Sequence, residues 1–170
     1  MIFLGIGSNL PSTYGDRFKN IDLAIKYLLK EKITLIKKSN FYETESFPEK
    51  SNPKFINVII SLETSLSAKK IAEIILNIEE KLERKRNKKN DPRTCDIDII
   101  DYNGKNISFN FNDLVFSTPH KQLLNRNFVL IPLKEVSPNW RHPINNQLIN
   151  VLIEKLPTED KNSILKVDKT

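Results

Sequence analysis

The chain has 170 residues, 39% of them hydrophobic and 28% charged, which suits one folded domain over residues 1–170. Its net charge of +6 favours an anionic partner such as a nucleotide, a nucleic acid or an acidic surface. A single cysteine excludes an intramolecular disulfide, no apolar run approaches membrane-spanning length, and no secretory signal pattern begins the chain, so we expect a cytoplasmic protein.

The first half of the chain alternates strand and helix patterns. Apolar and β-branched runs predict three strands, over residues 2–8, 33–44 and 55–62. A helical repeat of apolar residues over 16–30 predicts a helix capped by Asp16. The alternation of the third strand places Phe55, Asn57 and Ile59 on one of its faces.

A second helix begins the other half of the chain. It starts at Ser65 or Ser67 and runs to about Lys85. The stretch over 83–91 is basic and has no apolar residue, so we expect a mobile loop there. The β-branched run around Asp96 predicts a further strand.

The rest of the chain carries weaker patterns. Asn103-Gly104 indicates a hairpin that pairs a short strand over 107–109 with the preceding strand. Residues 110–116 lead to an extended loop over 117–120. Helical patterns over 125–135, with a break or a first turn at Pro132, and over 148–156 complete the chain.

This order of elements predicts an α+β fold. The succession β-α-β-β-α-β is that of the ferredoxin-like fold, an antiparallel sheet with two helices packed on one face. The C-terminal elements are expected to extend this core.

Two carboxylates mark the most informative stretch. Asp96 and Asp98 are two residues apart in a strand, so both side chains leave the same face. Paired carboxylates repel each other unless a cation lies between them, and Mg²⁺ prefers oxygen ligands together with substrate phosphates. Arg93 lies close enough in sequence to bind a phosphate. The ordinary alternative is a solvated strand face, since Asp-x-Asp is common.

Other candidates each have a structural alternative. Glu79 lies at the edge of an apolar helix stripe and ordinarily reaches solvent. His120 and Arg126 are suited to contacting phosphate, although a lone histidine is more often structural. Phe55 and Phe128 can stack on a flat heterocycle or pack in the core. The Gly5-x-Gly7 pair is explained by a tight turn at a strand end.

Taken together and in this order, these residues resemble the 6-hydroxymethyl-7,8-dihydropterin pyrophosphokinase family. The matching segments lie between about residue 2 and residue 155, and the Pro-Arg-Thr-x-Asp-x-Asp block is the most specific. They are Gly7-Ser-Asn-Leu10, Ser39-Asn-Phe-Tyr-Glu-Thr44, Phe55-Ile-Asn57, Leu62-Glu-Thr64, Ile78-Glu79, Arg84, Pro92-Arg-Thr-x-Asp-Ile-Asp-Ile99, Pro119-His120, Asn125-Arg126-x-Phe128 and Pro132-Leu133.

The resemblance implies a Mg-dependent enzyme of folate biosynthesis that transfers the pyrophosphoryl group of ATP to the hydroxymethyl oxygen of the pterin and releases AMP. It implies two Mg²⁺ ions on Asp96 and Asp98. The implied ATP-binding residues are Glu79, Arg84, Arg93, Ile99, His120 and Arg126, and the implied pterin-binding residues are Thr44, Phe47, Phe55, Asn57, Asp96 and Phe128. Arg84, Arg86 and Arg93 would act in catalysis, the first two on a loop that closes over the reactants.

The chain departs from the family pattern at a few positions. Asp91 stands where the family has Gly, the loop before it lacks a common Trp, and Lys121 replaces an aromatic residue. Two other readings remain open at this point: a non-enzymatic nucleic-acid-binding module on a ferredoxin-like sheet, and a degenerate member that binds pterin but transfers slowly. If the chain is a pyrophosphokinase, we expect a monomer with small-molecule substrates and neither nucleic-acid nor membrane partners.

Overall fold

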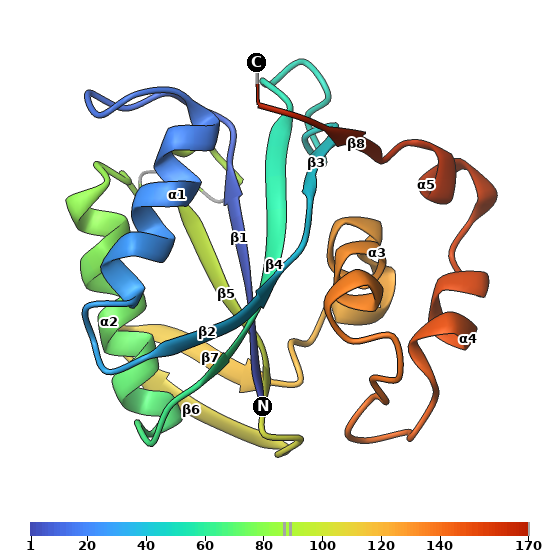
Figure 1. The fold of residues 1–170 in the computed structure, drawn as a ribbon. Helices are drawn as coiled ribbons and strands as arrows, with labels where there is room; N and C mark the ends of the chain where they lie inside the picture. Colours follow the sequence, from blue (N-terminus) through green and yellow to red (C-terminus); the bar gives the residue numbers. More distant parts are fainter. Residues whose placement is uncertain (87, 89, 170) are drawn as a thin grey trace.

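The computed structural model describes residues 1–86, 88 and 90–169 (Figure 1). Residues 87 and 89 of the expected basic loop therefore lie outside the described residues. The elements are β1 (Ile2–Ser8), α1 (Arg17–Leu28), β2 (Thr34–Lys38), β3 (Phe41–Thr44), β4 (Phe55–Glu63), α2 (Ala68–Lys81), β5 (Asp96–Tyr102), β6 (Ile107–Phe111), β7 (Leu114–Thr118), a 3₁₀ turn (Leu123–Asn125), α3 (Asn127–Val136), α4 (Ile149–Glu154), α5 (Thr158–Asn162) and β8 (Leu165–Val167).

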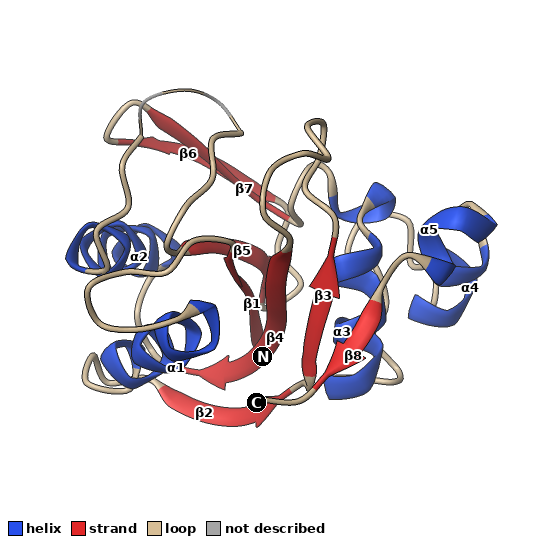
Figure 2. Ribbon diagram, turned by 90° about the horizontal axis from the view of Figure 1, so that it is seen from above, coloured by secondary structure: helices blue, strands red, loops and turns tan. Residues whose placement is uncertain are grey.

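The main sheet is antiparallel and has helices on both faces. Its strand order is β5-β1-β4-β3-β8, and β2 also pairs with β4. Helices α1 and α2 cover one face, and α3 lies on the other with α4 beyond it (Figures 1 and 2). The strand order and the position of α1 and α2 confirm the expected ferredoxin-like core.

Burial on both faces follows from the sequence of the central strands. In β1, Ile2, Leu4 and Ile6 belong to the core beneath α1 and α2. Phe3 belongs to a second core beneath α3, together with Ile59 of β4. The near-continuous apolar character of β1 and β4 is therefore that of strands covered on both sides rather than of a sheet with one wet face.

The predicted strand over 33–44 is two strands. β2 ends at Lys38, β3 begins at Phe41, and Ser39 occupies the break. The Ser39 N–H donates to the Ile59 carbonyl at 2.9 Å, and the Ser39 hydroxyl accepts from the Ile59 N–H at 3.0 Å. Because this side chain replaces a backbone acceptor, the pairing with β4 is interrupted and resumes one register further on.

The predicted pairing of residues 107–109 with the preceding strand is wrong. β6 pairs with β7 in a separate two-stranded sheet, and Asn112 and Asp113 form its turn with φ values of 47° and 58°. Figure 2 shows this ribbon set apart from the main sheet. Asn103-Gly104 and Asn112-Asp113 both have positive φ values, and the second pair closes the hairpin although Asn-Gly is the stronger local signal. β7 was not predicted, and it includes the first two residues of the extended loop expected over 117–120.

Two helix predictions need correction. α2 ends at Lys81, four residues earlier than expected, and Glu83 then adopts a left-handed φ of 67°. α3 runs through Pro132 without the expected break, so the proline costs one backbone hydrogen bond and leaves the helix intact. The short helix predicted over 148–156 is confirmed as α4, whereas α5 and β8 were not expected. No helix in the described part of the chain has the length and apolar character that a membrane crossing requires.

Candidate active site

The two carboxylates of β5 share one face, as the alternation predicts. The side chains of Asp96 and Asp98 are 21% and 36% exposed, whereas Cys95, Ile97 and Ile99 are buried on the opposite side. Burial raises the pKa of the Cys95 thiol well above its usual value, so this cysteine is not a nucleophile. The acidic pair lies on β5 at the edge of the main sheet, where a ligand can reach it.

Beside this pair, the glycines of β1 form the bottom of the candidate site, which we call the glycine floor. Gly7 lies opposite Asp96 on one side and opposite Asn57 of β4 on the other. A Cβ atom on Gly7 would lie 2.9 Å from Asn57 Oδ1, so the missing side chain makes room for that amide. The expectation that Gly5 and Gly7 mark a turn at a strand end is wrong, because both lie inside β1.

Arginine side chains surround Asp96. Arg84 Nη1 lies 2.5 Å from Asp96 Oδ1, and Arg93 Nε lies 2.8 Å from Asp96 Oδ2. Burial alone would raise the pKa of the Asp96 carboxyl, but the two guanidinium groups outweigh it and hold the pKa below its usual value. Asp96 is therefore ionised in the folded protein.

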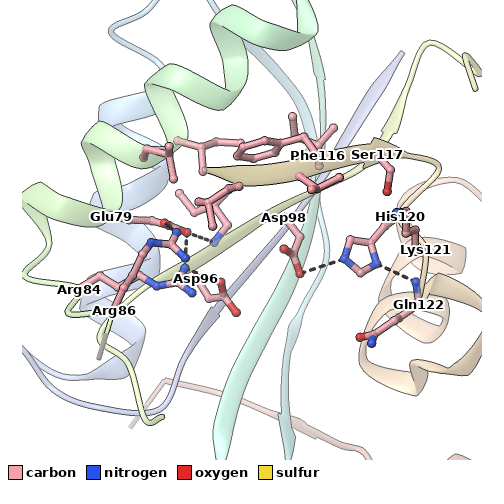
Figure 3. Close-up of a pocket in the computed structure, with 16 residues that line it drawn as sticks. Glu79, Arg84, Arg86, Asp96, Asp98, Phe116, Ser117, His120, Lys121 and Gln122 are labelled. Atoms are coloured by element: carbon pink, nitrogen blue, oxygen red, sulfur yellow. Dashed lines mark hydrogen bonds and ion pairs between the residues drawn. The ribbon is translucent and has the colours of Figure 1, made fainter. Parts of the chain in front are cut away.

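Asp98 has a different set of neighbours. Arg126, the residue before α3, places Nη1 3.0 Å from Asp98 Oδ2, and His120 Nε2 is 4.0 Å from the same oxygen. Burial lowers the pKa of His120, and the nearby Asp98 opposes that effect. His120 Nδ1 accepts a hydrogen bond from the Gln122 N–H at 3.2 Å, which orients the ring and directs Nε2 toward Asp98 (Figure 3).

Glu79 does not reach solvent, contrary to the ordinary interpretation of its position. It is 2% exposed, forms ion pairs with Arg84 and Arg86, and accepts a hydrogen bond from the Ile97 N–H at 2.7 Å. Burial raises the pKa of Glu79 to about 7, while Arg84 and Arg86 oppose the rise. The carboxylate ties the end of α2 to β5 and fixes the position of both arginines.

Both aspartates, Glu79 and His120 line a cleft of about 340 Å³, together with Arg84 and Arg86. Figure 3 shows Glu79, Arg84, Arg86 and Asp96 at one end and His120 at the other, with Asp98 between them. Apolar side chains of α2, β5 and β7 supply the remaining walls; they are Ile75, Leu76, Ile97, Ile99, Leu114, Val115 and Phe116. The cleft thus combines a charged floor with an apolar wall.

Aromatic and amide groups lie across the glycine floor from the acidic pair. Asn57 is buried, and its amide donates to Thr44 Oγ1 at 2.9 Å. The guanidinium carbon of Arg93 lies 5.0 Å from the centre of the Phe55 ring, and that of Arg126 lies 5.4 Å from the centre of the Phe128 ring. Phe47 is 85% exposed and is not packed into this group.

The donor set suits a hard divalent cation that also binds phosphate. Among residues 1–86, 88 and 90–169, no cluster of three histidine, cysteine or acidic side chains could hold a metal alone. Two carboxylates are nevertheless sufficient for Mg²⁺ when water and phosphate oxygens complete the octahedron. Asp96 and Asp98 meet this requirement, since both belong to one strand face and both open into the cleft.

Sequence reasoning missed the part that Asn9 plays. The Asn9 and Leu10 N–H groups both donate to the Arg93 carbonyl, at 3.0 and 3.1 Å, and Asn9 Oδ1 accepts from the Arg93 N–H at 2.7 Å. The Asn9 amide also donates to the Pro53 carbonyl at 3.0 Å. Asn9 therefore connects Arg93 to the 45–54 loop. Its position directly after a strand that contains glycines is the one feature of the sequence that could have indicated this role.

Comparison with known proteins places the chain in one family. The model of the 7,8-dihydro-6-hydroxymethylpterin-pyrophosphokinase family matches residues 3–138. A Synechocystis 2-amino-4-hydroxy-6-hydroxymethyldihydropteridine pyrophosphokinase is 33% identical over 154 residues, which cover 90% of this chain and 74% of the relative. The enzyme of the same name from Aquifex aeolicus is 34% identical over 143 residues, 84% of each chain.

Longer proteins also match. The folic acid synthesis protein fol1 of Schizosaccharomyces pombe is 33% identical over 158 residues, which are 92% of this chain but 20% of that protein. The chain therefore spans about a fifth of the length of this relative. A crystal structure of Plasmodium falciparum HPPK-DHPS superposes with a TM-score of 0.67 at 18% identity, covering 91% of this chain and 45% of the other, which shows the shared fold.

Proposed function

Because the chain belongs to the 7,8-dihydro-6-hydroxymethylpterin-pyrophosphokinase family, we propose that it transfers the pyrophosphoryl group of ATP to the hydroxymethyl oxygen of 6-hydroxymethyl-7,8-dihydropterin and releases AMP, a step of folate biosynthesis. The observation that carries the proposal is the acidic pair Asp96 and Asp98, which opens into a cleft and is surrounded by cationic side chains.

The acidic pair would hold two Mg²⁺ ions together with the phosphates of ATP. When bound, these ions neutralise charge on the phosphoryl oxygens and align the attacking and leaving oxygens. Arg84 and Arg93 contact Asp96 directly. With a cation held by Asp96, both guanidinium groups would be free to bind the polyphosphate, which would offer them a new anionic partner.

The remaining charged groups of the cleft would position the nucleotide. His120 and Arg126 lie at the Asp98 end, and Arg86 lies at the Glu79 end. Glu79 would act by orienting Arg84 and Arg86, and Ile99 also lines the cleft. Phosphoryl-type transfer depends mainly on positioning and on charge stabilisation, which is what such a set provides.

The pterin would lie on the far side of the glycine floor. Phe55 and Phe128 offer two ring faces, and the Asn57 amide, oriented by Thr44, offers a donor and an acceptor to the ring edge. Exposed Phe47 would cover the ring from solvent. The glycine floor brings this group next to Asp96, so the hydroxymethyl oxygen would meet the phosphates over β1.

The nucleic-acid-binding alternative is not supported. An RNA-binding ferredoxin-like sheet uses an open face with aromatic residues on its central strands. Here α3 covers that face through the core that contains Phe3, Ile59 and Leu130. Arg84 and Arg86 line the cleft, and Arg93 and Arg126 pair with its two aspartates.

Domain and assembly remain part of the proposal. Two cores on opposite faces of one sheet support a single domain over residues 1–170. We propose that this domain works as a monomer in the cytoplasm, where its single buried cysteine needs no oxidising environment.

The test is the release of AMP from ATP and the hydroxymethyl pterin in the presence of Mg²⁺. The wild-type chain should release AMP only when pterin is present, and Asp98→Asn should lower turnover roughly 100-fold because it removes a metal ligand. Asp113→Asn, in the exposed β6–β7 turn, is the matched control and should retain activity. Absence of pterin-dependent AMP from the wild-type chain would refute the function. Full activity of Asp98→Asn would refute the part assigned to the acidic pair.

A further inference from the structure

One carboxylate outside the cleft has an unusually complete set of donors. Glu135, in the last turn of α3, accepts from the Asn40 N–H at 3.1 Å, from the Asn40 amide, and from the Tyr42 hydroxyl at 3.0 Å. All of these donors belong to the β2–β3 break and to β3 itself. The carboxylate therefore fastens α3 to the strand beside β4.

The same helix carries a candidate pterin contact at its other end. Phe128 and Glu135 are seven residues apart in α3, which is about two turns, so they lie on one side of the helix roughly 10 Å apart. The position of the C-terminal end of α3 relative to β3 therefore also determines the direction in which Phe128 points.

β3, the strand that Glu135 contacts, lies next to the other candidate pterin-binding residues. Tyr42 is the cross-strand partner of Asn57, and Thr44 is the partner of Phe55. Side chains of directly paired residues leave the same face of a sheet. Tyr42, Asn57, Thr44 and Phe55 therefore form a two-by-two block on the face that α3 covers.

The hydrogen bonds of Glu135 favour a fixed distance between α3 and β3. Burial and the hydrogen bond to Glu135 raise the pKa of Tyr42 to about 12, so the phenol remains a donor throughout the working pH range. Hydrogen bonds to an ionised acceptor are stronger and shorter than neutral ones. Ser39 holds the same break from the β4 side through its two hydrogen bonds to Ile59.

We propose that Glu135 is a positioning residue for the pterin site: through Asn40 and Tyr42 it fixes α3 against β3 and so sets the separation between Phe128 and the block that contains Phe55 and Asn57. The inference rests on the proposed function, because it assumes that these residues bind the pterin. Glu135 itself touches no substrate; its influence is carried by the helix and the strand that it joins.

The experiment compares Glu135→Gln and Tyr42→Phe with Val136→Ala. Val136 is the next residue of α3 and is buried in the core under that helix, so its truncation destabilises the same helix while the contact to β3 stays in place. For each variant, titration calorimetry gives the Kd of the pterin and the Kd of a non-hydrolysable ATP analogue with Mg²⁺, and thermal melting gives the Tm.

Glu135→Gln should weaken pterin binding about fivefold to tenfold and Tyr42→Phe about threefold, with the ATP-analogue Kd within twofold of the wild-type value. Val136→Ala should leave the pterin Kd unchanged at a similar loss of Tm. The double variant should weaken binding no more than Glu135→Gln alone, because the two residues share one contact.

Two results would overturn the inference: a pterin Kd unchanged in Glu135→Gln, or an equal weakening in Val136→Ala, which would mean that general loss of stability is the cause. Failure of the wild-type chain to bind pterin would instead refute the proposed function. The two failures are thus distinguished by the wild-type titration.

Discussion

Gly7→Ala tests the glycine floor most directly. The added methyl would lie 2.9 Å from Asn57 Oδ1 and 3.5 Å from Phe55 Cδ1. An ordinary contact begins near 3.4 Å, so the Asn57 amide must move by about 0.5 Å. That movement lengthens its 2.9 Å hydrogen bond to Thr44 toward the limit of a useful interaction.

The energetic consequence can be worked out from this geometry. Loss of one buried hydrogen bond costs about 1 kcal/mol, and a methyl forced into a packed site adds about 1 kcal/mol more. Reduced freedom of the unfolded chain offsets part of this, about 0.5 kcal/mol, because alanine replaces glycine. We expect the free energy of unfolding to fall by about 1–2 kcal/mol and pterin binding to weaken roughly tenfold, since the amide no longer faces the ring edge.

Gly5→Ala is the matched control on the same strand. Its methyl would lie 3.3 Å from the Cδ1 atoms of Ile100 and Ile59, whose flexible ends can move. Pterin affinity should therefore be unchanged. Titration calorimetry and urea denaturation of both variants provide the measurements. The reasoning is refuted if Gly7→Ala binds pterin like the wild type, or if Gly5→Ala weakens binding as much.

Three further predictions each concern one residue. Arg84→Ala should lower turnover roughly 100-fold in the AMP assay while the pterin Kd stays within twofold, because Arg84 contacts Asp96 and Glu79 but no residue of the aromatic group; weaker pterin binding with normal turnover would contradict this. Glu79→Gln should lower the free energy of unfolding by about 1–3 kcal/mol in urea, because Arg84 and Arg86 lose a buried partner, and an unchanged midpoint would argue against that loss. Cys95 should not react with an aromatic disulfide reagent until the protein is unfolded, since it is fully buried and its pKa is raised; rapid reaction of the native protein would show that the strand face is misassigned.

Local signals in the sequence were sufficient for most elements. Asp16 caps α1 as the pattern predicts, and Ser67, one of the two serines expected to begin the second helix, caps α2; a cap depends only on residues within one turn. The strict alternation of β5 separates Asp96 and Asp98 from Ile97 and correctly predicts their common face.

Long-range pairing was beyond the reach of the same signals. Asn103-Gly104 and Asn112-Asp113 both have positive φ values, and the local preference favours Asn103-Gly104, yet the hairpin closes at Asn112-Asp113. The return of the chain to β5 determines which turn closes the hairpin: after β7, the His120 N–H donates to the Ile100 carbonyl at 2.9 Å. β8 escaped prediction for a similar reason, since a three-residue strand exists only by pairing with β3.

The candidate site also has parts that follow from local sequence and parts that depend on long-range contacts. The acidic pair was visible in sequence because its two residues are neighbours. The burial of Glu79 was not, because it depends on the Ile97 N–H and on two arginines beyond the end of α2. The assignment of individual residues to ATP and pterin remains a prediction until the variants are measured.

The register of the sheet connects these parts. One row of cross-strand partners runs from Asp96 through Gly7 and Asn57 to Tyr42, and so contains a candidate metal ligand, the floor, a candidate pterin contact and the residue bound to Glu135. A shift of β1 by one residue would turn every side chain of that strand to the other face and place Ile6 where Gly7 now leaves space. The site therefore depends on the exact pairing of four strands as much as on its charged residues, which is why core substitutions that change this pairing should abolish binding even when the acidic pair is intact.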